Sequence, residues 1–205
     1  LLNMPFEGIN NTATNNAWDY SGYGNTGSEN GGVLWNATGG YDRKGAYQFD
    51  GINDYIGLAK SSNPNKISIT AWIKPSQQPA GGEQAIVDYG YMLFTVNTAG
   101  NNFNVYPNVG QAAIACTISS LTVGQWYHVG ITYDYSYNST NGNISCYLNG
   151  ALAQSRIHTV TDPTGFSGTN IGRYGGNSRF FNGTIDEAMI FNRTLSTDQI
   201  YAIFS

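Results

Sequence analysis

The feature that most constrains the fold is a two-residue alternation of apolar and other side chains in short runs. The clearest run is KISITAWIKP at residues 66–75, where Ile67, Ile69, Ala71 and Ile73 share one side. Because successive side chains of a strand point to opposite faces, this period indicates a β-strand with one face in a core. A helix would need a period near 3.6 residues, so the run favours an all-β chain.

Further alternating runs follow, with residues typical of tight turns between them. QWYHVGITYD at 125–134 and NISCYL at 143–148 each gather apolar side chains on one face. Asp-Gly or Asn-Gly pairs, which tolerate positive φ, stand at 50–51, 141–142, 149–150 and 182–183. About a dozen short strands without a long amphipathic helix predict a β-sandwich.

The C-terminal segment carries the one helix signal. In LSTDQIYAIF, Ser196 is placed as the N-cap and Gln199 stands at the third helical position, which is a capping box. We expect Ile200 and Ile203 to anchor this helix on the sandwich. The polar, glycine-rich stretch 10–40 is predicted to form surface loops with one or two short strands.

Length and charge narrow the class of protein. A chain of 205 residues suits one large all-β domain, and we assign residues 1–205 to it. The net charge is −4 and the nine Lys and Arg are scattered, which disfavours nucleic-acid binding. No apolar run is long enough for a membrane span, and no signal peptide is recognisable, so we expect a mature chain or a domain excised from a longer secreted protein.

Cys116 and Cys146 lie in separate predicted strands. The sequence leaves two alternatives open, a disulfide across the sheet or two buried thiols, because spacing alone does not place the Cα atoms within bridging range. Six glycosylation sequons occur, little more than random order would give, at Asn10, Asn36, Asn138, Asn143, Asn182 and Asn192.

Ordered motifs along nearly the whole chain resemble the laminin-G-like, concanavalin A-like jelly-roll family. They are DYSGYGNTGS, GGYDRKGAYQFDGINDYIGL, ISITAWIKP, GQWYHVGITYD, ISCYLNGALA and RFFNGTIDEAMIFNRTLSTDQI. The resemblance implies a β-sandwich of two antiparallel sheets, with the short C-terminal helix added. It also implies a function in binding, since members are similar to lectins, pentraxins and carbohydrate-binding modules, although a shared fold does not settle the ligand.

The resemblance further implies a structural calcium at the edge of the sandwich. The family draws its ligands from the first strand, a turn after an early strand and the last long strand, which here correspond to Glu7, to Asp50 with the Gly51 carbonyl, and to Asp186. Calcium takes six to eight oxygens, including backbone carbonyls. The alternative is that Asp50 and its neighbours only make Asx-turns. An EF-hand is excluded, because the sixth residue counted from Asp50 is Tyr55 rather than glycine.

No catalytic pattern is visible. Jelly-roll hydrolases use a Glu-x-Asp-x-Glu strand, which is absent, and Asp186 and Glu187 are adjacent, so strand alternation would point them to opposite faces. His128 and His158 are the only histidines, and neither accompanies a nucleophile-elbow motif. We therefore expect a non-catalytic protein.

Sugar recognition uses aromatic faces and planar polar groups, and the glycine-rich segment GRYGGNSRFF offers both near a predicted rim. The candidate ligand-binding residues are Tyr89, Tyr91, Arg173, Tyr174, Asn177 and Arg179. The four tryptophans are expected to pack in the core or on the sheet faces.

The sequence thus predicts an extracellular binding module at the cell surface or in a secreted protein. Its expected partners are a glycan or a surface protein, and neighbouring domains of a longer chain. The alternatives are a spacer module without a ligand and, less favoured, a glycoside hydrolase or lyase.

Overall fold

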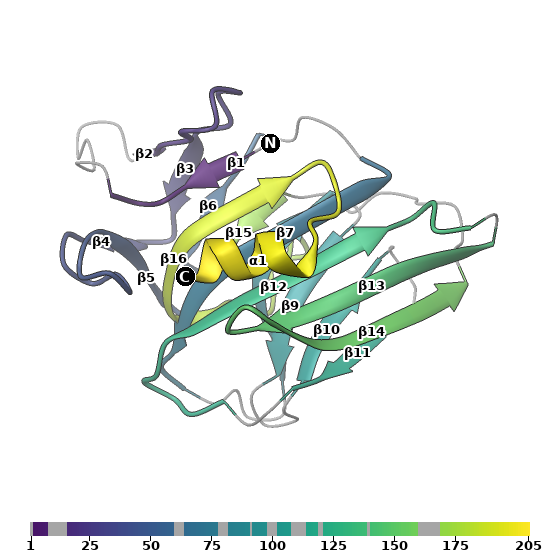
Figure 1. The fold of residues 1–205 in the computed structure, drawn as a ribbon. Helices are drawn as coiled ribbons and strands as arrows, with labels where there is room; N and C mark the ends of the chain where they lie inside the picture. Colours follow the sequence, from purple (N-terminus) through teal and green to yellow (C-terminus); the bar gives the residue numbers. More distant parts are fainter. Residues whose placement is uncertain are drawn as a thin grey trace.

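A computed structural model shows two antiparallel β-sheets packed face to face, with one short helix outside them (Figure 1). This is the β-sandwich that the sequence predicts. The structure describes residues 2–7, 16–59, 64–77, 82–90, 92–97, 102–107, 114–118, 121–138, 140–159 and 169–205.

The first sheet, called sheet A, has the strand order β14-β13-β12-β7-β16-β5-β4, with β1 also paired to β16. Its strands are β1 (Leu2–Met4), β4 (Leu34–Asn36), β5 (Ala46–Asp50), β7 (Lys66–Pro75), β12 (Tyr127–Asp134), β13 (Asn141–Leu148), β14 (Ala151–Thr159) and β16 (Asn182–Phe191).

The second sheet, called sheet B, has the order β11-β10-β9-β8-β15-β6-β3-β2. Its strands are β2 (Asn16–Ala17), β3 (Gly27–Asn30), β6 (Tyr55–Gly57), β8 (Gln84–Tyr89), β9 (Met92–Asn97), β10 (Asn102–Tyr106), β11 (Ile114–Thr117) and β15 (Thr169–Ile171). Three short strands, β2, β3 and β4, therefore lie in the stretch 10–40, where one or two were predicted.

The core lies between the sheets and follows the predicted alternation. Ile67, Ile69, Ala71 and Ile73 of β7 are all fully buried in it. Their register with β12 is antiparallel, and that strand adds its own apolar face to the same core. The predicted faces of the two strands are confirmed.

A disulfide joins the two sheets at one edge. Cys116 in β11 is bonded to Cys146 in β13, with the two Cα atoms 6.3 Å apart and a sequence separation of 30. The structure thus decides between the two alternatives that the sequence left open. Closing a loop of this length stabilises a fold by roughly 3–4 kcal/mol in the chain-entropy account.

Helix α1 (Thr197–Phe204) packs on the outer face of sheet A, the face away from the core (Figure 1). Its capping box is present as predicted, since the Ser196 hydroxyl accepts the Gln199 N–H and the Gln199 side chain accepts the Ser196 N–H. Ile200 is fully buried against Tyr147 and Leu195. No helix in the described part of the chain has the length and hydropathy needed to span a bilayer.

Candidate functional site

The centre of β16 is the point where its neighbouring strand changes. β5 pairs with residues 182–185 of β16, and β1 pairs with residues 188–190. Between them the register with β7 shifts, and Glu187 adopts a left-handed φ of 49°. This is a β-bulge, a feature that re-aims side chains and occurs often beside functional sites.

The bulge inserts one residue into the alternation of β16. Ile185, Ala188 and Ile190 all lie in the core, which leaves both Asp186 and Glu187 outside it. The prediction that these two acidic side chains point to opposite faces assumed a regular strand, and the bulge removes that assumption.

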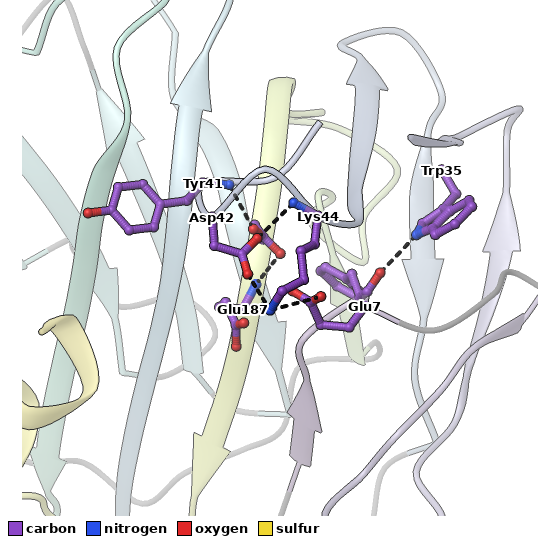
Figure 2. A network of polar contacts seen from close by, with 8 residues as sticks. Glu7, Trp35, Tyr41, Asp42, Lys44 and Glu187 are labelled. Atoms are coloured by element: carbon purple, nitrogen blue, oxygen red, sulfur yellow. Dashed lines mark hydrogen bonds and ion pairs between the residues drawn. The ribbon is translucent and has the colours of Figure 1, made fainter. Parts of the chain in front are cut away.

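Two loops meet in the gap between β1 and β5. One is the Phe6–Glu7 segment, where Phe6 has φ 59°; the other runs from Gly40 to Gly45. The backbone carbonyl of Phe6 accepts the Trp35 indole N–H at 2.8 Å (Figure 2). A Cβ on Gly45 would lie 1.9 Å from that same carbonyl oxygen, so only glycine allows the loops to approach this closely.

The gap gathers four carboxyl groups, those of Glu7, Asp42, Asp186 and Glu187, which we call the acidic gap (Figure 2). Among the described residues, the ammonium that lies between these carboxyls belongs to Lys44, with Nζ 2.6 Å from Asp42 Oδ2 and 3.4 Å from Glu7 Oε2. The other oxygen of Glu7, Oε1, is buried without a hydrogen-bond partner. The acidic gap therefore holds more negative charge than its own cation balances.

Burial and repulsion dominate the electrostatics of the acidic gap. Asp186 has no exposed surface, and its carboxylate accepts the backbone N–H of Tyr41 at 3.0 Å and of Glu187 at 2.8 Å. Burial, helped by the charges of Glu187 and Asp42, raises the pKa of Asp186 to about 7. Burial and the charges of Glu7 and Asp42 likewise raise the pKa of Glu187 to about 7. Carboxylate oxygens are the ligands that a hard cation prefers, although in the described part of the chain no three such side chains are arranged so that they could hold a metal ion.

The structure corrects the predicted ligand set at Asp50 and Gly51. Asp50 pairs with Asn182, so it lies four residues along β16 from Asp186, roughly 13 Å at about 3.3 Å per residue. Its Oδ1 accepts the N–H of Ile52 at 2.7 Å and makes the Asx-turn of the alternative interpretation. Of the predicted set, only Glu7 and Asp186 come into one cluster.

A second candidate site is the hairpin Arg173–Arg179 between β15 and β16, called the rim loop. Its Tyr174 and Ser178 form an isolated β-bridge, and Asn177 and Arg179 have positive φ. The Gly175 N–H donates to the buried Asp88 carboxylate at 2.7 Å. The rim loop is thereby fastened to the outer face of sheet B.

The two arginines of the rim loop lie on aromatic rings. The Arg173 guanidinium is 3.4 Å from the centroid of Tyr55 and donates to Asn170 Oδ1 at 3.2 Å. The Arg179 guanidinium is 4.7 Å from the Tyr106 centroid and 5.5 Å from that of Tyr174. These contacts hold planar donors at fixed positions.

Beneath the rim loop, polar side chains stand on the outer face of sheet B. Glu83 collects hydrogen bonds from the Asn104 amide and, at 2.8 Å, from the Tyr106 hydroxyl, and it lies 3.5 Å from Arg179. Asp88 and Asn170 are also buried. Sequence reasoning missed Glu83, Asp88 and Asn170, although the latter two could have been found as polar residues at outward positions of apolar strands.

The structure places the predicted ligand-binding residues in different parts of the molecule. Arg173, Tyr174, Asn177 and Arg179 come together in the rim loop. Tyr89 does not join them: it is 3% exposed and packs in the core, which corrects its assignment to a ligand surface. Tyr91 lies outside the described residues.

Comparison with known proteins defines the class. The model of the concanavalin A-like lectin/glucanases superfamily matches residues 49–201, and the chain belongs to this superfamily. No curated protein matches the sequence significantly.

Solved structures show the same fold at low identity. Domain 4 of AbnA, a GH43 extracellular arabinanase from Geobacillus stearothermophilus solved with arabinotriose, is 18% identical with a TM-score of 0.63, covering 87% of this chain and 84% of that domain. The receptor-binding domain of botulinum neurotoxin type G is 17% identical with a TM-score of 0.71, covering 100% of this chain and 50% of its own. The binding domain of Paraclostridial Mosquitocidal Protein 1 is 19% identical with a TM-score of 0.66, covering 91% and 48%.

The chain thus spans about half the length of the two toxin binding domains that it resembles. These similar structures carry names of binding domains, and the arabinanase domain is one part of a hydrolase.

Proposed function

We propose that the protein is a non-catalytic extracellular binding module that recognises carbohydrate at the rim loop. The observation that carries this proposal is a pair of buried donors without acceptors beside an aromatic surface. Arg173 Nε and Asn170 Nδ2 have no hydrogen-bond partner, although both are buried. A buried donor left unpaired costs about 1–3 kcal/mol, so a ligand acceptor here gains binding free energy.

Sugar hydroxyls supply such acceptors. Each hydroxyl both donates and accepts, so it can serve Arg173 and Asn170 as an acceptor and Asp88 or Glu83 as a donor. The rings of Tyr174 and Tyr106 add apolar faces for the C–H surface of a sugar. The arabinanase domain bound to arabinotriose, which shares this fold, supports the same class of ligand.

Arabinotriose binding measured by calorimetry, beside a broad glycan array, tests the proposal. Arg173→Ala should weaken binding of any sugar found by about tenfold or more, because a charged donor is lost. Arg156→Ala on the exposed strand β14 is the matched control, since it removes the same group far from the rim loop. An Arg156 variant as weak as the Arg173 variant would contradict the proposal.

The second candidate function is a spacer or a protein-binding module of a surface protein. A clean failure to bind any glycan would favour it. Hydrolysis is disfavoured by burial, because Asp186 has no exposed surface and cannot reach a substrate in this arrangement. An extracellular location is supported by the Cys116–Cys146 disulfide, a bond that persists in oxidising compartments.

We also propose that the acidic gap holds a structural calcium. Glu7, Asp42, Asp186 and Glu187 would supply its oxygens, since the buried Glu7 Oε1 lacks a partner and Lys44 balances only part of the charge. The described side chains do not form a group of three or more that could already hold a metal ion, so binding would have to draw these carboxyls closer together. The ion would supply positive charge that lets the buried carboxyls ionise. Asp186 would orient the Gly40–Gly45 loop through the Tyr41 N–H, and Glu7 would hold the end of β1 against it.

A further inference from the structure

A pocket that neither the rim loop nor the acidic gap uses lies at the β4 edge of sheet A. It has a volume of about 320 Å³ and is lined by Gly31, Gly32, Leu34, Gln48, Phe49, Asp50 and Asp54. We call it the edge pocket. Its volume is at the small end of the range for ligand sites and suits one sugar ring.

Two connections between the sheets build the edge pocket. The β3–β4 turn contains Gly31 and Gly32, both with positive φ, and the β5–β6 turn contains Asp50 to Asp54. The turns touch closely: a Cβ on Gly31 would lie 2.1 Å from the Asn53 carbonyl oxygen. Only glycine permits this contact, so the sequence preserves the shape of the pocket at Gly31.

The wall of the edge pocket contains a buried carboxylate oxygen without a partner. Asp54 is 4% exposed; its Oδ2 accepts the Asp50 N–H at 2.9 Å, whereas Oδ1 has no hydrogen-bond partner. The nearest atom to a Cβ built on Gly32 is this Oδ1, at 3.7 Å. Burial, followed by the charge of Asp50, raises the pKa of Asp54. A charged acceptor in this position needs a donor, and none of the residues that the structure describes provides one.

The rest of the wall is half polar and half apolar. Tyr47 and Phe49 point into the core, so Gln48 and Asp50 project from the outer face of β5. Leu34 stands opposite Gln48 and is 65% exposed, because no described residue covers it. An apolar side chain beside carboxylates and an amide matches a sugar ring, which has a C–H face and a rim of hydroxyls.

We propose that the edge pocket is a second glycan site, in which neighbouring sugar hydroxyls donate to Asp54 and Asp50 while the ring packs on Leu34. This site does not depend on the rim loop. A cation is a poorer occupant, because calcium needs six to eight oxygens and the pocket offers two carboxylates, one already bonded through Oδ1 to the Asx-turn. Within the described residues, no group of three metal-ligating acidic, His or Cys side chains is found that could hold an ion.

A sugar hydroxyl can reach Asp54 Oδ1 only if the turn that contains Gly31 and Gly32 moves slightly. Asp54 Oδ1 is covered in this structure, and the Gly32 peptide lies beside it. Because glycine has no side chain, this turn can shift slightly at little steric cost. The backbone amides of Gly31 and Gly32 should therefore report binding directly.

The test is a titration of the ¹⁵N-labelled protein with a panel of methyl glycosides, each followed by amide chemical shifts. We expect at least one glycoside to shift Gly31, Gly32 and the Gln48 side-chain amide saturably. Asp54→Asn keeps the shape and should weaken that binding by about tenfold. Leu34→Ala removes only an exposed side chain and should also weaken it, while Arg179→Ala, whose side chain contacts Tyr106 and Tyr174, should leave these shifts unchanged.

Three results would overturn the proposal. The first is the absence of shifts at the edge pocket with every glycoside in a folded protein. The second is binding that Asp54→Asn and Leu34→Ala both leave intact. The third is that calcium chloride shifts the same amides and the glycosides do not. Since Arg179→Ala probes the rim loop separately, failure at either site is distinguishable from failure at the other.

Discussion

The acidic gap and the rim loop both contain non-glycine residues with positive φ, but the charges that they bring together differ. Among the described residues, six non-glycine residues have positive φ, and five lie at these two places: Phe6, Arg43 and Glu187 at the first, Asn177 and Arg179 at the second. Such conformations cost free energy and persist where the surroundings enforce them. In the acidic gap they bring like charges together, whereas in the rim loop they bring opposite charges and rings together.

The difference shows which charges or hydrogen-bonding groups remain without a partner in each region. The rim loop pairs Arg179 with Glu83 and lays both arginines on rings, so its charges are largely balanced, and the donors left open are Arg173 Nε and Asn170 Nδ2. The acidic gap has four carboxyl groups for one lysine. We therefore expect the first to respond to sugars and the second to cations, and four experiments can break or sharpen that contrast.

The largest effect should come from acid, through the buried His128, whose ring packs against Trp72 and Phe204. Burial lowers the pKa of His128 to about 4. The unfolded state takes up this proton near 6.5, so the contribution of His128 to the free energy of unfolding should fall by about 3 kcal/mol as pH drops from about 6.5 to 4. Denaturant titrations of the wild type and of His128→Leu over that range should show this loss as the difference between the two pH profiles.

The carboxyls of the acidic gap act with the opposite sign, because their raised pKa values favour the protonated folded state as pH falls. The variant comparison therefore isolates His128. Equal slopes for the wild type and His128→Leu would show that the acid response arises elsewhere.

Calcium should give the next largest effect, and only through the acidic gap. At a hundredfold excess over its dissociation constant, the ion should add about 2.7 kcal/mol to the free energy of unfolding. Melting with calcium and with chelator measures this. Asp186→Asn should remove the difference, whereas Glu83→Gln in the rim loop should retain it. An unchanged midpoint after verified metal removal would refute the calcium proposal.

Glu83→Gln should lower the free energy of unfolding by about 2 kcal/mol, because a carboxylate that serves Asn104, Tyr106 and Arg179 loses its charge. Urea denaturation measures the loss. Asp198→Asn, in the first turn of α1, is an exposed control of the same chemistry. If Glu83→Gln lowers the free energy of unfolding no more than this control does, the contacts between the arginines and the tyrosine rings alone hold the rim loop in place.

The smallest effect should come from Lys44, whose ammonium occupies part of the acidic gap. Lys44→Met should tighten calcium binding, because the ion then meets no competing charge, and calorimetry would report it. Lys66→Met is the matched control, since Lys66 is ion-paired with Asp134 at 2.7 Å on the same sheet. Weaker calcium binding in the Lys44 variant would mean that the lysine organises the site.

The sequence predicted the elements whose signals are local. The alternation of β7 and the capping box of α1 are fixed within a few residues, and both are confirmed. The bulge at Glu187 was not predictable, because it arises where β1 and β5 meet along β16, a tertiary event. Asp50 was misplaced for a similar reason: chain order suggested proximity to Asp186, but strand register separates them.

The exchange of partners along β16 also sets how the fold would resist pulling. Leu2 pairs with Ile190 and Met4 with Ala188, so the outer ends of β1 and β16 emerge at the same side of the sheet (Figure 1). A tensile load applied at Leu2 and at Phe191, the end of β16, would therefore peel β1 away one hydrogen bond at a time rather than shear all its bonds together. Once β1 has detached, the load would act on Phe6 and Glu7. The hydrogen bond from Trp35 to Phe6 and the ion pair between Lys44 and Glu7 would be the next contacts to resist it.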